Sequence, residues 1–130
     1  MLRKALILLT DLGLVGYWIM VASGVRCVGA GPGDVLTAWH MAFLPLDALA
    51  VLAGVAWLLL PRTHRLHDPM LIIALALTHA SGLMEVVFFL QWGSWEASLW
   101  LSNLWLMLMP VGVGLVALVR GAPVGKASAA

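Results

Sequence analysis

The sequence predicts an all-α integral membrane protein, a single bundle of four transmembrane helices over residues 1–130. Composition is the first reason, because the chain is 63% hydrophobic and 10% charged, with a mean hydropathy of +1.04. A soluble domain of this length cannot bury so much apolar surface. The second reason is that four segments reach the about 20 apolar residues that a helix needs to cross a bilayer. Little of the chain lies outside them.

The first helix is expected at residues 5–25. Arg3 and Lys4 precede it as in a signal peptide, but its apolar run is longer than a signal segment and contains Asp11. We therefore expect it to stay in the membrane uncleaved. Gly13 and Gly16 are expected to let this helix approach a neighbour closely.

The second helix is expected at residues 38–60, where Pro61 ends it. Pro45 predicts a kink, because its missing N–H frees a carbonyl about one turn earlier. Ala50 and Gly54 are four residues apart and predict a face on which helices pack closely.

The third helix is expected at residues 70–91, with Asp68 as N-cap and Pro69 at the first helical position. Two histidines in the loop before it, His64 and His67, are expected to be solvated. Ala74, Thr78 and Gly82 repeat the small-residue spacing of the second helix.

The fourth helix is expected at residues 98–119, with a kink at Pro110. Most tryptophans fall at helix ends, where indoles favour the headgroup zone. This belt comprises Trp39, Trp92, Trp95 and Trp100 on one side of the membrane and Trp57 on the other.

Basic residues are distributed unevenly among the connections. Six of the seven flank the first helix, the second loop and the end of the fourth helix, and Arg26 alone lies on the other side. The positive-inside rule then predicts that both termini are cytoplasmic, in a bacterial plasma membrane. The single cysteine, Cys27, excludes an internal disulfide. Residues 29–34 are glycine-rich, but Pro32 removes an N–H that a phosphate site would need, so we expect a turn.

Among the polar side chains inside the predicted spans, four ionisable groups and one amide are the candidates for function. Each costs free energy to insert, roughly 2.5–3.5 kcal/mol for a charged group, so such residues usually face a bundle interior or a wet cavity. Helix direction places three of them in the outer half of the membrane and Asp11 in the inner half. The five residues are Asp11, Asp47, His79, Glu85 and Asn103.

A candidate site follows from these depths. Asp47 and Glu85 are the candidate acid/base pair, with Asp11 auxiliary to them. His79 lies six residues from Glu85, about 120° round the helix at about 100° per residue, so we expect it to face Asp11 or a second subunit. Four further residues are expected to position the substrate or line its pocket, namely Tyr17, Trp18, Asn103 and Trp105.

Three functions fit this pattern. The first is a membrane-embedded enzyme, an isomerase or cyclase, that uses these carboxylates on a lipophilic substrate, since a desolvated carboxylic acid keeps its proton and can donate it. The second is a small proton-coupled transporter or multidrug-type exporter that uses the same acids. The third is a non-catalytic accessory subunit whose polar groups only join helices.

The expected partners are the bilayer, a lipophilic small molecule or lipid, and a second copy of the chain in a homo-oligomer. The sequence gives no reason to expect a cofactor or nucleic acid. His79, Asp47 and Glu85 contain donors for a mixed metal site, but no helix carries an HxxxH or ExxH spacing, so no metal is expected.

Several segments resemble the YvaD-like small bacterial membrane proteins, a family of unknown function. They are Thr10-Asp11-Leu12-Gly13 with Tyr17-Trp18, Trp39 with Phe43-Leu44-Pro45-Leu46-Asp47, Ser81-Gly82-Leu83, and Asn103-Leu104 with Met107 and Pro110. They touch all four helices, and the resemblance implies a four-helix bacterial membrane protein without implying an activity. Glu85 and His79 lie outside these segments.

Overall fold

The computed structural model describes residues 2–25, 35–93 and 95–121, and all its regular structure is helical. The helices are α1 (Leu2–Ala22), α2 (Val35–Met41), α3 (Leu44–Leu59), α4 (His67–Trp92) and α5 (Ala97–Gly121). Four spans are long and apolar enough to cross a membrane, with α2 and α3 together forming the second. The predicted all-α class and four spans are confirmed. Arg26, Cys27 and residues 29–34 lie outside the described residues.

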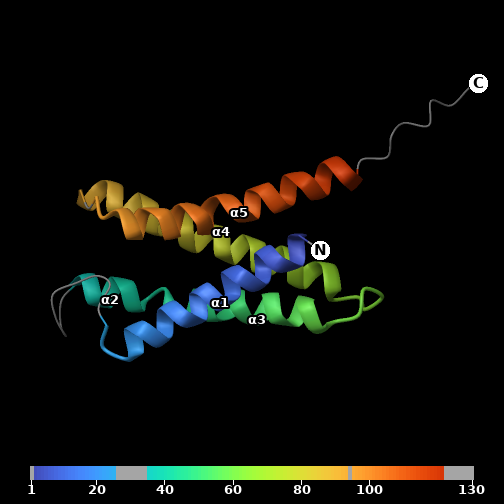
Figure 1. The fold of residues 1–130 in the computed structure, drawn as a ribbon, viewed down its shortest axis with the longest axis horizontal. Coiled ribbons are helices and arrows are strands. Elements are labelled where there is room, and N and C mark those ends of the chain that lie inside the picture. Colours follow the sequence, from blue (N-terminus) through green and yellow to red (C-terminus); the bar gives the residue numbers. More distant parts are fainter. Residues whose placement is uncertain (1, 26–34, 94, 122–130) are drawn as a thin grey trace, which may run out of the picture.

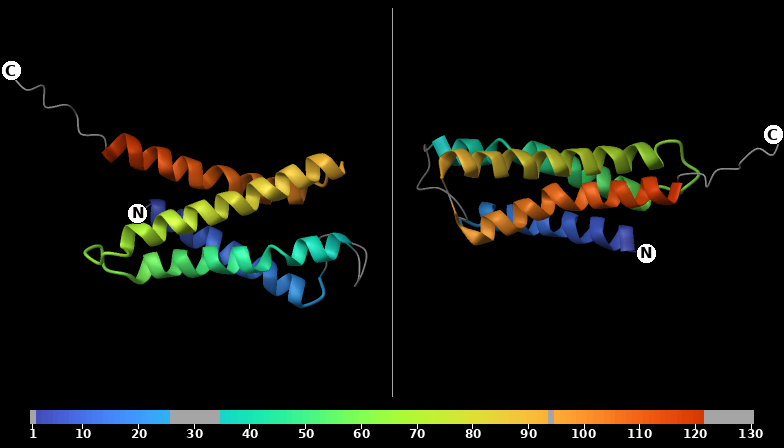
Figure 2. Two further views of the ribbon diagram at one scale, coloured as in Figure 1. Left: turned by 180° about the vertical axis from the view of Figure 1, so that it is seen from behind. Right: turned by 90° about the horizontal axis from the view of Figure 1, so that it is seen from above.

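The helices form two layers, which are clearest from above in Figure 2. One layer holds α3 and α4 and the other holds α1 and α5. Helix α1 packs against α3, α3 against α4, and α4 against α5. Helices α1 and α5 make few contacts with each other. The start of α1, the α3–α4 connection and the end of α5 lie at one end of the bundle (Figure 1). We call this the basic end, because Arg3, Lys4, Arg62 and Arg65 lie there.

Pro45 breaks the second span, as predicted. Helix α2 ends at Met41 and α3 begins at Leu44. Pro45 therefore lies in the first turn of α3, where its missing backbone N–H is not needed for a helical hydrogen bond. The intervening turn is closed by short-range bonds, among them Phe43 N to His40 O at 3.1 Å. By contrast, α5 continues through Pro110.

A dry core lies between α1, α3 and α4 at the basic end. Trp57 is only 1% exposed and packs with Ile7 and Leu71. The Arg3 guanidinium lies over the Trp57 ring, 5.5 Å from its centre, in a cation–π contact. The prediction of Trp57 as a headgroup-facing belt residue is therefore wrong. It lies at the expected end of its helix, but helix rotation points its ring inward.

Close helix contacts occur at two predicted glycines. A Cβ on Gly82 would lie 2.7 Å from the Asn103 carbonyl oxygen, so α4 and α5 touch through their backbones. At Gly54, the Asp11 carboxylate of α1 packs directly against the glycine backbone. The prediction for Gly13 and Gly16 is wrong, because a Cβ on either would meet no described atom within 4 Å.

The start of α4 also differs from prediction. The helix begins at His67 with Leu66 as its cap, so Asp68 is already helical and is not the N-cap. His67 is buried rather than solvated. Its Nδ1 bonds the Asp68 carboxylate at 2.9 Å, and its ring packs against Trp57. His64 is exposed as expected.

Candidate functional site

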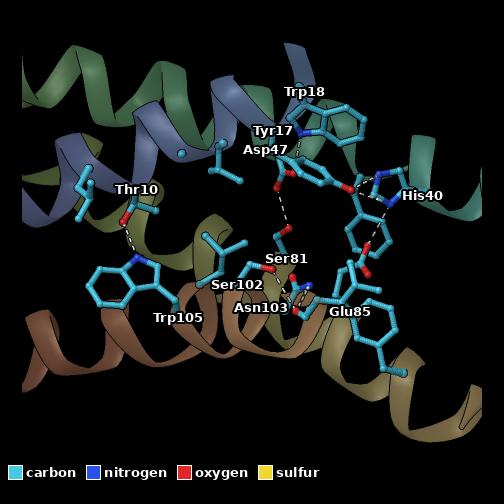
Figure 3. A pocket seen from close by; sticks show the side chains of 17 residues that line it. Thr10, Tyr17, Trp18, His40, Asp47, Ser81, Glu85, Ser102, Asn103 and Trp105 are labelled. Carbon is cyan, nitrogen blue, oxygen red and sulfur yellow. Dashed lines mark hydrogen bonds and ion pairs between the residues drawn. The ribbon is translucent and has the colours of Figure 1, made fainter. Parts of the chain in front are cut away.

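A cavity of about 210 Å³ lies in the half of the bundle away from the basic end. Every described helix contributes to its wall (Figure 3). On the α1–α5 side its lining residues are exposed at the bundle surface, namely Leu9, Gly13, Ser102 and Trp105. The cavity therefore opens at the side of the bundle, at the sparsely packed seam between α1 and α5.

Asp47 is fixed to the cavity wall by two donors. Trp18 Nε1–H donates to Oδ2 at 2.9 Å, and Ser81 Oγ–H donates to Oδ1 at 2.7 Å. These bonds join α1, α3 and α4. Because both oxygens accept a hydrogen bond, this carboxylate is held in one orientation and its cost of burial is reduced.

Glu85 is held differently, although it lines the same cavity. Its side chain is buried, yet no described side chain or backbone group hydrogen-bonds its carboxylate. Its ionic neighbour is His40, whose Nδ1 lies 3.9 Å from Oε1. The Tyr17 hydroxyl bonds the other ring nitrogen, Nε2. In the tautomer in which Nε2–H donates to the Tyr17 hydroxyl, Nδ1 presents its lone pair towards Glu85 and can accept a proton.

Aromatic faces surround these groups. The Trp18 and His40 rings are 5.3 Å apart, and Tyr17 meets each edge-on at 5.5 and 5.4 Å. Phe43 and Phe89 complete an apolar wall. Aromatic faces carry negative electrostatic potential, and the described lining contains no lysine or arginine. The cavity thus favours a neutral apolar group or a positive charge.

The α5 wall contributes an amide and an indole. Asn103 lines the cavity and donates through Nδ2 to the Leu99 carbonyl at 3.0 Å. Trp105 reaches across to α1, where its Nε1–H donates to Thr10 Oγ at 3.0 Å. This bond crosses the sparsely packed α1–α5 seam at one edge of the cavity, on the left in Figure 3.

Six predicted residues therefore line one cavity: Tyr17, Trp18, Asp47, Glu85, Asn103 and Trp105. Two others do not. Asp11 is buried against Gly54, and its Oδ2 has no described partner. His79 donates through Nδ1 to the Met107 carbonyl of α5 at 2.7 Å, so the expectation that it faces Asp11 is wrong.

The His79 contact falls in the turn of α5 before Pro110. Proline at this position cannot donate to the Leu106 carbonyl. His79 of α4 donates to the next carbonyl along α5, that of Met107.

His40 is the residue that the sequence reasoning missed. It follows Trp39 near a helix end, where it looks like one more polar residue at headgroup level. A signal was present, because His40 and Asp47 are seven residues apart and two helical turns place both on one face. The contacts of Ser81 and Thr10 with other helices were also not predicted, since a hydroxyl can bond its own helix backbone as readily as a neighbouring helix.

No three histidine, cysteine, aspartate or glutamate side chains within residues 2–25, 35–93 and 95–121 gather closely enough to hold a metal ion. In particular, His79 points away from Asp47 and Glu85.

Fold and site define a four-span membrane protein whose bundle encloses a mainly apolar cavity bordered by two buried carboxylates. Residues 3–122 match a family of unknown function, DUF5360. The chain is also 30% identical over 115 residues to "Uncharacterized protein YvaD" of Bacillus subtilis (strain 168), covering 83% of this chain and 85% of that one. The chain belongs to the DUF5360 family, which confirms the resemblance seen in the sequence. No solved structure matches it.

Proposed function

We propose that the protein is a membrane-embedded enzyme that moves a proton on a lipophilic substrate, in an isomerisation or cyclisation. The observation that carries this proposal is the buried Glu85 carboxylate. It faces a cavity that opens at the side of the bundle, has no hydrogen bond from a described group, and lies 3.9 Å from His40 Nδ1. A carboxyl in such surroundings keeps its proton and can donate it.

The two carboxylates take different roles in this proposal. Glu85 is the acid, and His40 is the base that accepts a proton from the substrate and returns it to Glu85. Asp47 already accepts from Trp18 and Ser81, so it is a positioning residue that holds the Trp18 ring against His40. The sequence predicted Asp47 as the acid/base partner of Glu85, whereas the geometry favours His40 in that role.

One reaction step balances with these groups alone. The Glu85 carboxyl adds its proton to one carbon of a substrate double bond and becomes a carboxylate. The positive charge left on the substrate is stabilised by the Tyr17 and Trp18 faces and by Asp47. His40 then removes a proton from an adjacent carbon, the double bond re-forms in a new place, and the imidazolium passes that proton to Glu85. No co-reactant is consumed.

Deuterium incorporation tests this step for a substrate whose identity is unknown. Protein in liposomes is incubated in D₂O with total lipid extract of Bacillus subtilis, and the lipids are analysed by mass spectrometry. We expect one lipid class to gain deuterium, and Glu85→Gln to lower the rate at least about 100-fold, as loss of a general acid does. Glu96→Gln is the matched control, because Glu96 is an exposed carboxylate away from the cavity. Equal incorporation in both variants would refute the assignment of Glu85.

A second test fills the cavity. Gly13 lines it and a side chain there meets no described atom within 4 Å, so Gly13→Leu is expected to occupy the cavity without disturbing the helices. Gly16 is equally open but does not line the cavity, so Gly16→Leu is the control. The first variant should lose deuterium incorporation and the second should keep it.

A proton-coupled exporter is the second candidate, and one observation favours it. Trp105 lines the cavity and also a separate groove nearer the basic end. Movement of this one indole would join the two. In that case liposomes with a pH gradient should accumulate tetraphenylphosphonium without any deuterium incorporation into lipid. Trp105→Ala should uncouple accumulation from the gradient.

The orientation is part of the proposal: a bacterial plasma membrane with the basic end in the cytoplasm. Reporter fusions at the two termini should both give the cytoplasmic signal. A periplasmic signal at either terminus would overturn the orientation.

A further inference from the structure

A second hollow lies at the basic end, between the first turns of α1 and the last turns of α5. It is a groove of about 690 Å³ and is separate from the cavity described above. Two arginines stand at its outer rim, Arg3 from α1 and Arg62 from the α3–α4 connection. Its walls are otherwise apolar, chiefly Leu6, Val113 and Val116. No acidic residue is among its described lining.

The groove runs lengthwise along α5. Its lining extends from Ala117 near the helix end to Trp105 deep in the bundle, twelve residues and so about 18 Å of helix. That length matches an acyl chain spanning one leaflet, since the full hydrocarbon core is about 30 Å thick. Gly112 forms part of the floor, and a Cβ there would meet no described atom within 4 Å.

We propose that this groove is a binding site for an anionic phospholipid. The phosphate lies between Arg3 and Arg62 at headgroup level, and one acyl chain follows the α1–α5 seam towards Trp105. The charge at one end and the apolar length behind it complement such a lipid better than a zwitterionic one. Arg62 supplies charge from a different segment than Arg3, so the site requires the folded bundle.

Native mass spectrometry of the detergent-solubilised full chain tests the site, with phosphatidylglycerol and phosphatidylcholine as probes. We expect preferential retention of phosphatidylglycerol. Arg62→Gln should weaken it about fivefold, the usual contribution of one basic residue near anionic lipid. Arg65→Gln is the matched control, because Arg65 lies exposed in the same connection but does not line the groove. Equal losses from both variants would overturn the proposal, since they would reflect net charge alone.

A second pair of variants tests the chain-binding part. Gly112→Leu should fill the groove floor and reduce retained phosphatidylglycerol, whereas Gly114→Leu has the same open surroundings off the groove and should leave it unchanged. Dimer populations are read from the same spectra. If Gly112→Leu abolishes a dimer and leaves lipid retention intact, the groove is occupied by a second copy of the chain and the lipid proposal is wrong. Glycerol phosphate, which lacks the chains, should not displace the lipid.

Discussion

The two halves of the bundle are built from the same helices but packed in opposite ways. At the basic end, Trp57, Ile7 and Leu71 form a dry core. In the other half, the same helices enclose a cavity lined by Asp47 and Glu85. The contrast indicates that the core between α1, α3 and α4 supplies the stability of the bundle, while the space for ligands lies in the cavity and along the α1–α5 groove.

The α1–α3 contact shows how one interface serves both halves. Asp11 meets Gly54, and Trp18 meets Asp47, seven residues further along α1 and seven residues back along α3. This is the register of two antiparallel helices. In the first pair a carboxylate is sealed against a backbone, and in the second a carboxylate borders open space. A buried acid in this protein is therefore not by itself a sign of a site.

Replacing the buried indole should have the largest effect on stability. Trp57→Ala removes a ring that is 1% exposed, and should lower the free energy of unfolding by about 3–5 kcal/mol. Trp95→Ala, at 73% exposed, is the control and should change it little. Unfolding in mixed micelles measures both. Equal losses would show that this core does not supply the stability of the bundle.

Alanine substitutions at Gly82 and Gly13 should give the next largest difference in unfolding free energy. Gly82→Ala drives a methyl group into the α5 backbone and should cost about 1–3 kcal/mol of unfolding free energy. Gly13→Ala places the same methyl group in the cavity and should stabilise the helix by up to about 1 kcal/mol. Opposite signs in the same unfolding assay would show that the α4–α5 contact is close, while the cavity side of α1 is open.

Variants of the two cavity carboxylates should differ in their effect on stability. In Asp47→Asn, the amide NH₂ faces one of the two donors, Trp18 or Ser81, and can no longer accept from it. This loss should lower the free energy of unfolding by about 1–3 kcal/mol. Glu85→Gln breaks no hydrogen bond to a described group, so its stability cost should be the smaller of the two. Thermal unfolding compares them. A larger loss for Glu85→Gln would mean that this residue supports the fold.

The smallest effect is expected at the α1–α5 seam. Trp105→Phe and Thr10→Val each remove one partner of the Trp105–Thr10 hydrogen bond. Thr10→Val also removes the bond from Thr10 to the Leu6 carbonyl, and the cycle subtracts that loss. A double-mutant cycle should give a coupling of about 0.6 kcal/mol, the average for such bonds between membrane helices. A coupling near zero would show that the seam is held by packing alone.

Much of the site was predictable because depth follows from residue number. The rise per residue fixed how far Asp47, Glu85 and Asn103 lie from the helix ends, and they do line one cavity. Rotation about each helix axis was not predictable in the same way. Hydrophobic length alone does not set it, because lipid accepts any apolar face.

The individual errors share that cause. Trp57 lies at the expected depth with its ring turned inward. Gly13 and Gly16 have the composition of a contact face but meet no described neighbour. His79 is directed to α5 by a carbonyl near Pro110, and no feature of its own helix indicates that contact.

The sequence alone determined the class of protein, the four spans, the proline break and the depth of each intramembrane polar group. Those follow from apolar length and backbone chemistry, which are local. Only the tertiary structure decided which acids border a cavity and which is sealed. It brought His40 beside Glu85 and gave Asp47 two donors from other helices. The orientation of each helix about its axis depends on the shapes of all its neighbours at once.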